Sequence, residues 1–184
     1  MVALHPPVCD FGRMAPDFDL PGIDGQRHTL TSCRGQNGLL VMFICNHCPY
    51  VQAIIDRLIR DCRDLQAEGI GCVAIMSNDV AAYPADAPDE MARWAHALNF
   101  PFPYLYDADQ SVARAYGAVC TPDFFGYNAQ GELQYRGRLD ASGRQPAAPD
   151  AERELWLALR EIARTGQAPL QQQASIGCSI KWRN

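Results

Sequence analysis

The sequence lacks long apolar runs and clusters of basic residues, and we expect no secretory leader. No stretch approaches the roughly 20 apolar residues that a membrane-spanning helix needs, so we expect no spanning segment. The net charge is −5 and the basic residues are dispersed, which argues against a nucleic-acid or anionic-membrane partner, because both need a positive surface. Residues 1–7 contain no basic region followed by an apolar segment, so we expect a cytoplasmic protein. Small molecules and other proteins remain as candidate partners.

Internal repeats and an interdomain linker are also missing. A chain of 184 residues is long enough to bury roughly 70% of its unfolded surface in one core. We therefore expect a single domain over residues 1–184, with its core at about 12–165 and a C-terminal tail, 166–184, whose apolar residues dock on the body. The Pro/Ala-rich connector 141–149 is too short to separate two domains.

A disulfide framework is not expected either, although the chain has eight cysteines. Such frameworks are typical of short secreted chains, and this chain is neither short nor visibly secreted. Cys62 falls on the apolar side of a predicted helix and Cys72 in a predicted strand, so we interpret both as buried hydrophobic residues. Cys9 and Cys33 show no informative spacing. The cysteines that need a separate explanation are Cys45, Cys48, Cys120 and Cys178.

What the sequence does contain is one C-x-x-C motif at a predicted junction between a strand and a helix. The motif is Cys45-Asn46-His47-Cys48-Pro49. It follows the apolar run 38–44 and precedes an amphipathic stretch, and Pro49 suits the first helical turn because its missing N–H is not needed there. Free N–H groups at a helix start favour a thiolate and lower a cysteine pKa to roughly 3.5–7.5. The motif therefore predicts a reactive pair of sulfurs.

Apolar patterning predicts alternating strands and helices. A hairpin over about 15–30 comes first, and the remaining strands are predicted at 39–44, 70–76, 104–106, 124–127 and 133–138. Helices are predicted from Val51 to a stop at Gly69, and over 88–98, 110–116 and 151–164. This order indicates an α/β sandwich: a central mixed β-sheet with helices on both faces. Functional groups in such sheets lie at the carboxyl ends of strands, where Cys45 stands.

The order of strand, C-x-x-C, helix and then Thr121-Pro122 before a hairpin resembles the thioredoxin-like fold, in which a cis proline faces the redox pair. The opening Ala15-Pro16-Asp17-Phe18, with an N-terminal hairpin and an inserted strand and helix before Pro122, resembles the peroxiredoxin-like branch of alkyl hydroperoxide reductases and thiol-specific antioxidant proteins. The resemblance covers about residues 12–165.

This resemblance implies a thiol–disulfide oxidoreductase. Cys45 would be the exposed nucleophile and Cys48 the resolving cysteine, so that their disulfide is the only redox group and no metal or other cofactor is needed. Asn46, Pro49 and the Thr121-Pro122 pair would support them. The implied substrate is a protein disulfide or a small thiol, and the implied electron donor is a thioredoxin- or glutathione-type system.

Two further residues are candidates for tuning the pair. A protonated His47 would favour the thiolate and make the pair a stronger oxidant than thioredoxin, and a solvated loop histidine is the alternative. Thioredoxins carry a buried acid on the strand before the motif, but this chain has only apolar residues there. Asp79, at the end of the next strand, is therefore our candidate proton acceptor, and a turn aspartate is the alternative.

A peroxidase with Cys48 as the peroxidatic cysteine is the first alternative function. Peroxiredoxins have a threonine or serine three residues before that cysteine, a proline further upstream and an arginine near the strand after Pro122. Here Cys45 and Val41 take the first two positions, and no arginine lies between Ala115 and Tyr135. Efficient activation of peroxide is therefore not expected.

Metal delivery is the second alternative, because Cys45, His47, Cys48 and Cys120 are suitable ligands for a soft ion such as copper. Thioredoxin-like copper chaperones add a histidine late in the fold, whereas the last histidine here is His96. Two interpretations also stay open for the other cysteines. Cys120 is a third redox thiol or a packing residue, and Cys178 is an additional resolving thiol if the tail folds back on the pair.

Overall fold

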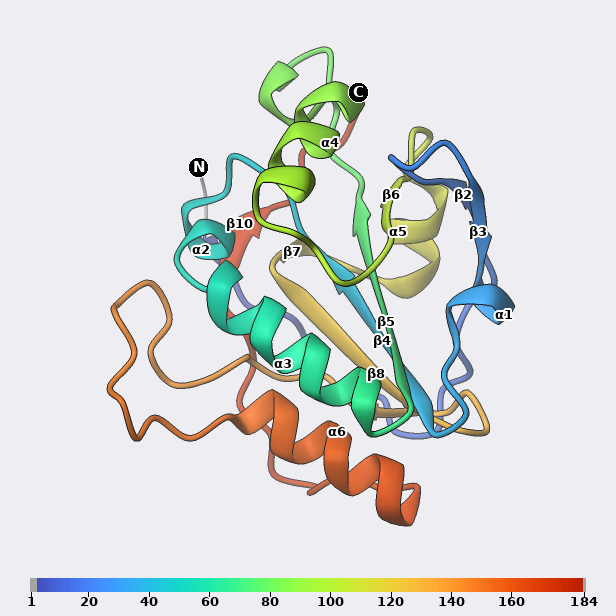
Figure 1. Ribbon diagram of the computed structural model, residues 1–184, viewed down its shortest axis with the longest axis vertical. Coiled ribbons are helices and arrows are strands. Elements are labelled where there is room, and N and C mark those ends of the chain that lie inside the picture. The colour runs from blue at the N-terminus through green and yellow to red at the C-terminus, as the bar shows by residue number, and fades with distance from the viewer. Residues whose placement is uncertain (1–2, 184) are drawn as a thin grey trace.

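The computed structural model describes residues 3–183, which form a central mixed sheet between two layers (Figure 1). The strand order is β9-β8-β4-β5-β6, and β8 runs antiparallel to both of its neighbours. Strand β5 is parallel to β6 and lies beside β4, where the Ile44 N–H donates to the Ile75 carbonyl over 3.1 Å. The strands are β4 (Gly38–Phe43), β5 (Ile70–Met76), β6 (Tyr104–Tyr106), β8 (Asp123–Asn128) and β9 (Leu133–Tyr135). The mixed sheet of the sequence prediction is thus confirmed.

Strand β4 is fully buried because both of its faces are covered. Leu40 and Met42 face the core that contains α3 (Ile55–Ala67) and α6 (Glu154–Thr165), which lie in front of the sheet in Figure 1. Val41 and Phe43 face the opposite core. That core is covered by α1 (Leu30–Cys33), α5 (Ser111–Tyr116) and the hairpin of β2 (Asp19–Pro21) and β3 (Arg27–Thr29). Helix α4 (Pro88–Ala97) and a one-turn 3-10 helix, η1 (Pro84–Asp86), form the inserted segment between β5 and β6.

The predicted helix from Val51 is in fact two helices, α2 (Pro49–Gln52) and α3. The Ile54 N–H donates to the Val51 carbonyl three residues back, so the backbone makes a tighter 3-10-type turn at this point. Val51 and Ile54 still face the same core as α3, which is why the apolar spacing did not reveal the break. Helix α6 also begins three residues later than predicted, since the Leu155 N–H donates to Leu139 instead of continuing a helix from Ala151.

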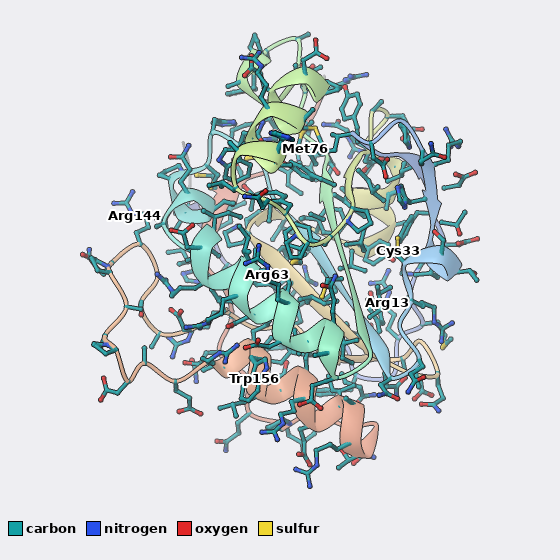
Figure 2. All side chains as sticks on the ribbon, viewed as in Figure 1. Arg13, Cys33, Arg63, Met76, Arg144 and Trp156 are labelled. Atoms are coloured by element: carbon teal, nitrogen blue, oxygen red, sulfur yellow. The ribbon has the colours of Figure 1, made fainter. Side chains whose placement is uncertain are left out.

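The loop between β9 and α6 leads away from the body, and Arg144 marks it in Figure 2. Two contacts tie this loop to the helices that follow β4. The Arg144 guanidinium lies 5.1 Å from the centre of the Tyr50 ring, and Asp140 pairs with Arg57 over 2.7 Å.

The C-terminal residues form a small second sheet beside the first. Its order is β1 (Ala3–Leu4), β10 (Gly177–Ser179) and β7 (Cys120–Thr121), all antiparallel. Residues 177–179 therefore lie against the strand that ends immediately before Pro122. Among residues 3–183, none of the helices combines the length and apolarity needed to cross a membrane.

Candidate active site

Cys45 and Cys48 lie in the loop between β4 and α2, at the carboxyl edge of the parallel strands. Cys48 is the N-cap residue of α2, and Pro49 is the first residue of that helix. The two residues are only 1% and 0% exposed, so the expectation of an exposed Cys45 is wrong for this structure. The reason is coverage by residues distant in sequence, since Thr121 contacts both sulfurs and the ring of Tyr83 stacks on His47 at 5.3 Å.

Thr121 contacts both sulfurs, each through a different one of its two oxygen atoms. The peptide bond between Thr121 and Pro122 is cis, as the family resemblance implied. The Thr121 carbonyl lies 3.0 Å from the Cys48 Sγ and accepts its S–H, while the Thr121 hydroxyl lies 3.4 Å from the Cys45 Sγ. Thr121, in the segment Thr121-Pro122 that we call the proline loop, therefore contacts both cysteines of the pair.

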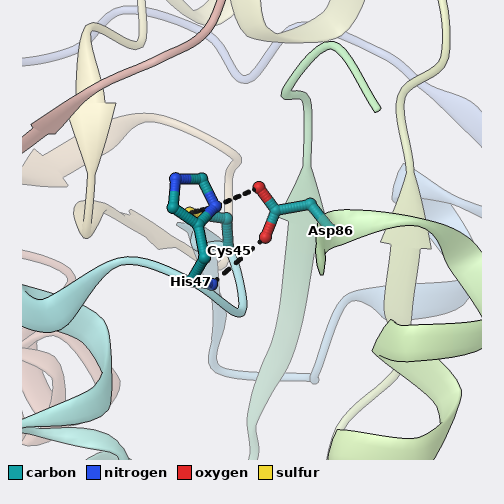
Figure 3. A group of neighbouring side chains, drawn as sticks. All are labelled: Cys45, His47 and Asp86. Atoms are coloured by element: carbon teal, nitrogen blue, oxygen red, sulfur yellow. Dashed lines mark hydrogen bonds and ion pairs between the residues drawn. The ribbon is translucent and has the colours of Figure 1, made fainter. Parts of the chain in front are cut away.

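A buried carboxylate that the sequence did not reveal holds the motif from the other side (Figure 3). Asp86 is fully buried at the end of η1 and accepts the backbone N–H groups of Asn46 (2.9 Å) and His47 (3.2 Å) through Oδ1. Its Oδ2 accepts His47 Nδ1 (2.6 Å) and the Asn78 amide (2.8 Å), and Nδ1 also lies 3.9 Å from the Cys45 Sγ. Burial of Asp86 disfavours its charge, but the hydrogen bonds from His47 and Asn78 outweigh burial and lower its pKa.

Asp79, our sequence candidate for the proton acceptor, lies elsewhere. Its carboxylate accepts the Ala81 N–H and pairs with Arg183 at 3.6 Å, and its own N–H donates to the Lys181 carbonyl. Asp79 therefore anchors the C-terminal residues, and Asp86 is the acid beside the cysteines. The only signal for Asp86 was indirect: a motif without an acid on the preceding strand needs one from another segment.

Asn46 supports the motif through its side chain. Its amide donates to the Ala85 carbonyl over 3.0 Å, and its Oδ1 accepts the buried Tyr104 hydroxyl over 3.1 Å. Gln52 in turn donates to the Asn46 carbonyl over 2.7 Å. The residue between the cysteines is thus fixed to the inserted segment and to β6.

The two cysteines influence each other's ionisation. The S–H of Cys45 stabilises a Cys48 thiolate and outweighs burial, and the Thr121 side chain and N–H groups of Cys178 and Val51 add to it, so that the pKa of Cys48 is lowered to about 5. The same bond, together with burial and the negative charge of Asp86, raises the pKa of Cys45 well above its ordinary value. One of the two thiols in the pair therefore loses its proton readily, and the other keeps its proton.

The remaining proton has two possible positions. When Cys45 holds it, Cys48 is the thiolate. When Cys48 holds it, the Thr121 carbonyl accepts the S–H and the Thr121 hydroxyl can donate to a Cys45 thiolate. Thr121 can thus stabilise the arrangement in which Cys45 is the nucleophile.

The other two candidate cysteines lie on the same small sheet. Cys178 faces Thr121 across the β10–β7 pair, and the Thr121 carbonyl accepts the Cys48 S–H, whereas the Cys120 S–H donates to the Pro122 carbonyl over 3.5 Å. Burial raises the pKa of Cys120, so it is a neutral, packed thiol.

Ligand atoms for a soft metal also come together, although only in part as predicted. Donor atoms of Cys45, His47 and Asp86 all lie within 4.8 Å of one another. However, His47 Nδ1 is bonded to Asp86 at 2.6 Å, and this bond would have to break before the nitrogen could bind a metal.

Arg136, the first arginine after Pro122 in the sequence, does not serve the cysteines. Arg136 pairs with the buried Asp123 over 2.9 Å and donates to the Gly117 carbonyl over 2.8 Å. Its guanidinium also stacks on Phe125, on the face of the sheet opposite to Cys45 and Cys48. The peroxide-binding set expected of a peroxiredoxin is therefore not assembled from this residue.

Residues 11–136 match the sequence model of the AhpC/TSA family. The chain belongs to this family. Peroxiredoxin Bcp of Escherichia coli is 26% identical over 133 residues, which cover 72% of this chain and 80% of that protein. The AhpC/TSA chain is also similar to an uncharacterized conserved protein of Geobacillus kaustophilus (40% identity, TM-score 0.93, 100% of this chain and 97% of that one) and to a hypothetical protein of Sinorhizobium meliloti (38%, 0.90, 97% and 97%). It is thus a thioredoxin-like redox protein of the peroxiredoxin-like branch.

Proposed function

We propose that this AhpC/TSA-family protein is a dithiol–disulfide oxidoreductase in which Cys45 attacks and Cys48 resolves. The observation that carries the proposal is the contact of Thr121 with both sulfurs, because it offers a hydroxyl to a Cys45 thiolate and a carbonyl to the Cys48 thiol. A single-cysteine peroxidase would have no use for this arrangement.

The reaction starts with the proton on Cys48. The Cys45 thiolate attacks one sulfur of the substrate disulfide, a mixed disulfide forms, and the departing thiolate takes the proton of Cys48. The Cys48 thiolate then attacks the Cys45 Sγ and releases the second substrate sulfur as a thiolate. Two electrons pass from the pair to the substrate, and the pair ends as the Cys45–Cys48 disulfide.

Asp86 and His47 act as positioning residues in this scheme. Asp86 fixes the backbone of the motif through two N–H groups and holds the His47 ring between itself and Cys45. Its charge opposes ionisation of Cys45, so the thiolate forms chiefly where the Thr121 hydroxyl compensates.

The family supports thiol or disulfide substrates. Within the proposal, the substrate is a protein disulfide or a small disulfide, the donor that restores the thiols is of the thioredoxin or glutathione type, and the reaction takes place in the cytoplasm. The buried pair must be uncovered to meet a large substrate.

The test is trapping of the mixed disulfide. We expect Cys48→Ser to accumulate a mixed disulfide through Cys45, and Cys45→Ser to reduce a model disulfide no faster than buffer. Cys33→Ser, a buried cysteine on the opposite face of the sheet, is the matched control and should retain full activity. Full activity of Cys45→Ser would refute the assignment.

Peroxidase activity is the second candidate because a peroxiredoxin is among the relatives. It requires Cys48 as the attacking sulfur, and the low pKa of Cys48 favours this. In that case hydrogen peroxide consumption should persist in Cys45→Ser and disappear in Cys48→Ser. A copper-binding role would instead appear as near-stoichiometric metal that is lost on mutation of either cysteine.

A further inference from the structure

The C-terminal strand β10 is built into the redox site. Cys178 stands opposite Thr121 in the antiparallel pair with β7, and the Ser175 hydroxyl donates to the Pro122 carbonyl over 3.0 Å. On the other side, the Lys181 N–H donates to the Asn78 side chain over 2.9 Å. The tail is therefore held by the two segments that also contact the motif.

The sequence at the tail permits this close approach. A Cβ atom on Gly177 would lie 2.1 Å from the Thr121 carbonyl oxygen and 3.0 Å from the Pro122 nitrogen, so a larger residue would push β10 away from β7. The absence of a side chain at this position places the next residue, Cys178, beside the proline loop.

Cys45, Cys48 and Cys178 lie in the same buried core, and of its five cysteines these are the ones that Thr121 contacts or pairs with. Thr121 links them, because its carbonyl contacts the Cys48 Sγ and its backbone pairs with Cys178. Cys178 thus stands opposite the residue whose carbonyl accepts the Cys48 S–H. Cys120, the neighbour of Thr121 on β7, makes its hydrogen bond to Pro122 instead.

We propose that Cys178 is a third exchanging thiol, which attacks Cys48 in the oxidised pair and forms a Cys48–Cys178 disulfide. This inference rests on the proposed function, since it starts from the Cys45–Cys48 disulfide. Cys178 becomes bonded to Cys48, the Cys45–Cys48 bond breaks, and Cys45 leaves as a thiolate. The proton of Cys178 moves to Cys45, so the step is an internal rearrangement that needs no external oxidant or reductant.

The geometry favours an internal partner over a dissolved one. Cys45 and Cys48 are buried, so an external thiol must first displace part of the structure, whereas Cys178 already lies inside the same cluster. Burial raises the pKa of Cys178, so its proton must pass to the departing Cys45 sulfur as the new bond forms. The rearrangement frees Cys45 while the oxidising equivalents remain stored in the protein.

The test is disulfide mapping by mass spectrometry after oxidation with one equivalent of diamide, which converts two thiols into a disulfide. In Cys45→Ser we expect Cys48–Cys178 as the main disulfide. In the oxidised wild type we expect a fraction with alkylatable Cys45, and this fraction should vanish in Cys178→Ser. Cys120→Ser, which changes a cysteine on strand β7 of the same small sheet, is the matched control and should keep the wild-type pattern of disulfides.

Two outcomes would overturn the proposal: no Cys48–Cys178 disulfide in folded Cys45→Ser, or a Cys48–Cys120 disulfide in its place. Gly177→Ala gives a second route that leaves all the cysteines intact. It should reduce the Cys48–Cys178 product and retain the Cys45–Cys48 disulfide, and an unchanged yield of both would also contradict the proposal. If the wild type forms no Cys45–Cys48 disulfide at all, the proposed function itself fails.

Discussion

Replacing Asp86 by asparagine should lower the pKa of Cys45, because it removes a buried negative charge from the site. The cleanest background is Cys48→Ser, in which Cys45 titrates alone. The donor atoms of Cys45 and Asp86 lie within 4.8 Å of each other. At an effective dielectric constant of roughly 20, a unit charge at that distance contributes about 3 kcal/mol, or about 2 pKa units.

The assay is the rate of Cys45 alkylation by iodoacetamide across a pH series. We expect the midpoint in Cys48→Ser/Asp86→Asn to lie about 2 units below that of Cys48→Ser. The His47 Nδ1–H, which Asp86 accepts at 2.6 Å, lies 3.9 Å from the sulfur, so any donation to Cys45 that its release permits would act in the same direction.

Asp79→Asn in the same background is the matched control. Asp79 pairs with Arg183 and anchors the tail, so its removal should leave the midpoint unchanged. A shift with Asp79→Asn and none with Asp86→Asn would refute our account of which acid controls the pair.

Three further predictions concern stability. The Asp86 carboxyl has a lowered pKa in the folded state, so its charge stabilises the fold above pH 3.8, its ordinary pKa, and this stabilisation is lost as the pH falls through the folded-state pKa. The urea midpoints of wild type and Asp86→Asn should therefore converge in acid, and a constant gap between them would contradict this. Arg136→Met leaves the buried Asp123 unpaired and should reduce the free energy of unfolding by about 3–5 kcal/mol in urea titrations, whereas no change would show that the pair is not needed. Gly71→Ala places a Cβ 1.9 Å from the Cys33 carbonyl and should cost about 1–3 kcal/mol, visible as a lower Tm; an unchanged Tm would mean that the Cys33 segment moves freely.

The local sequence pattern was sufficient to predict the elements in which burial is regular along one strand or helix. The continuous apolar run before Cys45 predicted a strand covered on both faces, and β4 is such a strand. Because the motif follows that run directly, its place at the carboxyl edge of the sheet was predicted as well. The position of Pro122 beside the pair came from the resemblance and agrees with the structure.

The sequence pattern was insufficient to predict contacts between residues that lie far apart in the sequence. Asn46 and Asp86 are 40 residues apart, and nothing in the short loop around Asp86 distinguishes it from Asp79. The apolar content of the tail indicated docking, but the pairing of Cys178 with Thr121 depends on strand register that only the folded chain fixes. The burial of Cys45 has the same origin, since its cover comes from Thr121 and the inserted segment.

The most direct test of dithiol–disulfide exchange is a stopped-flow comparison of the fully reduced protein with oxidised glutathione and with hydrogen peroxide at equal concentrations. Our account predicts faster oxidation by the disulfide, with a rate that Cys45→Ser abolishes and Cys33→Ser leaves unchanged. Faster oxidation by peroxide, retained in Cys45→Ser and lost in Cys48→Ser, would contradict it.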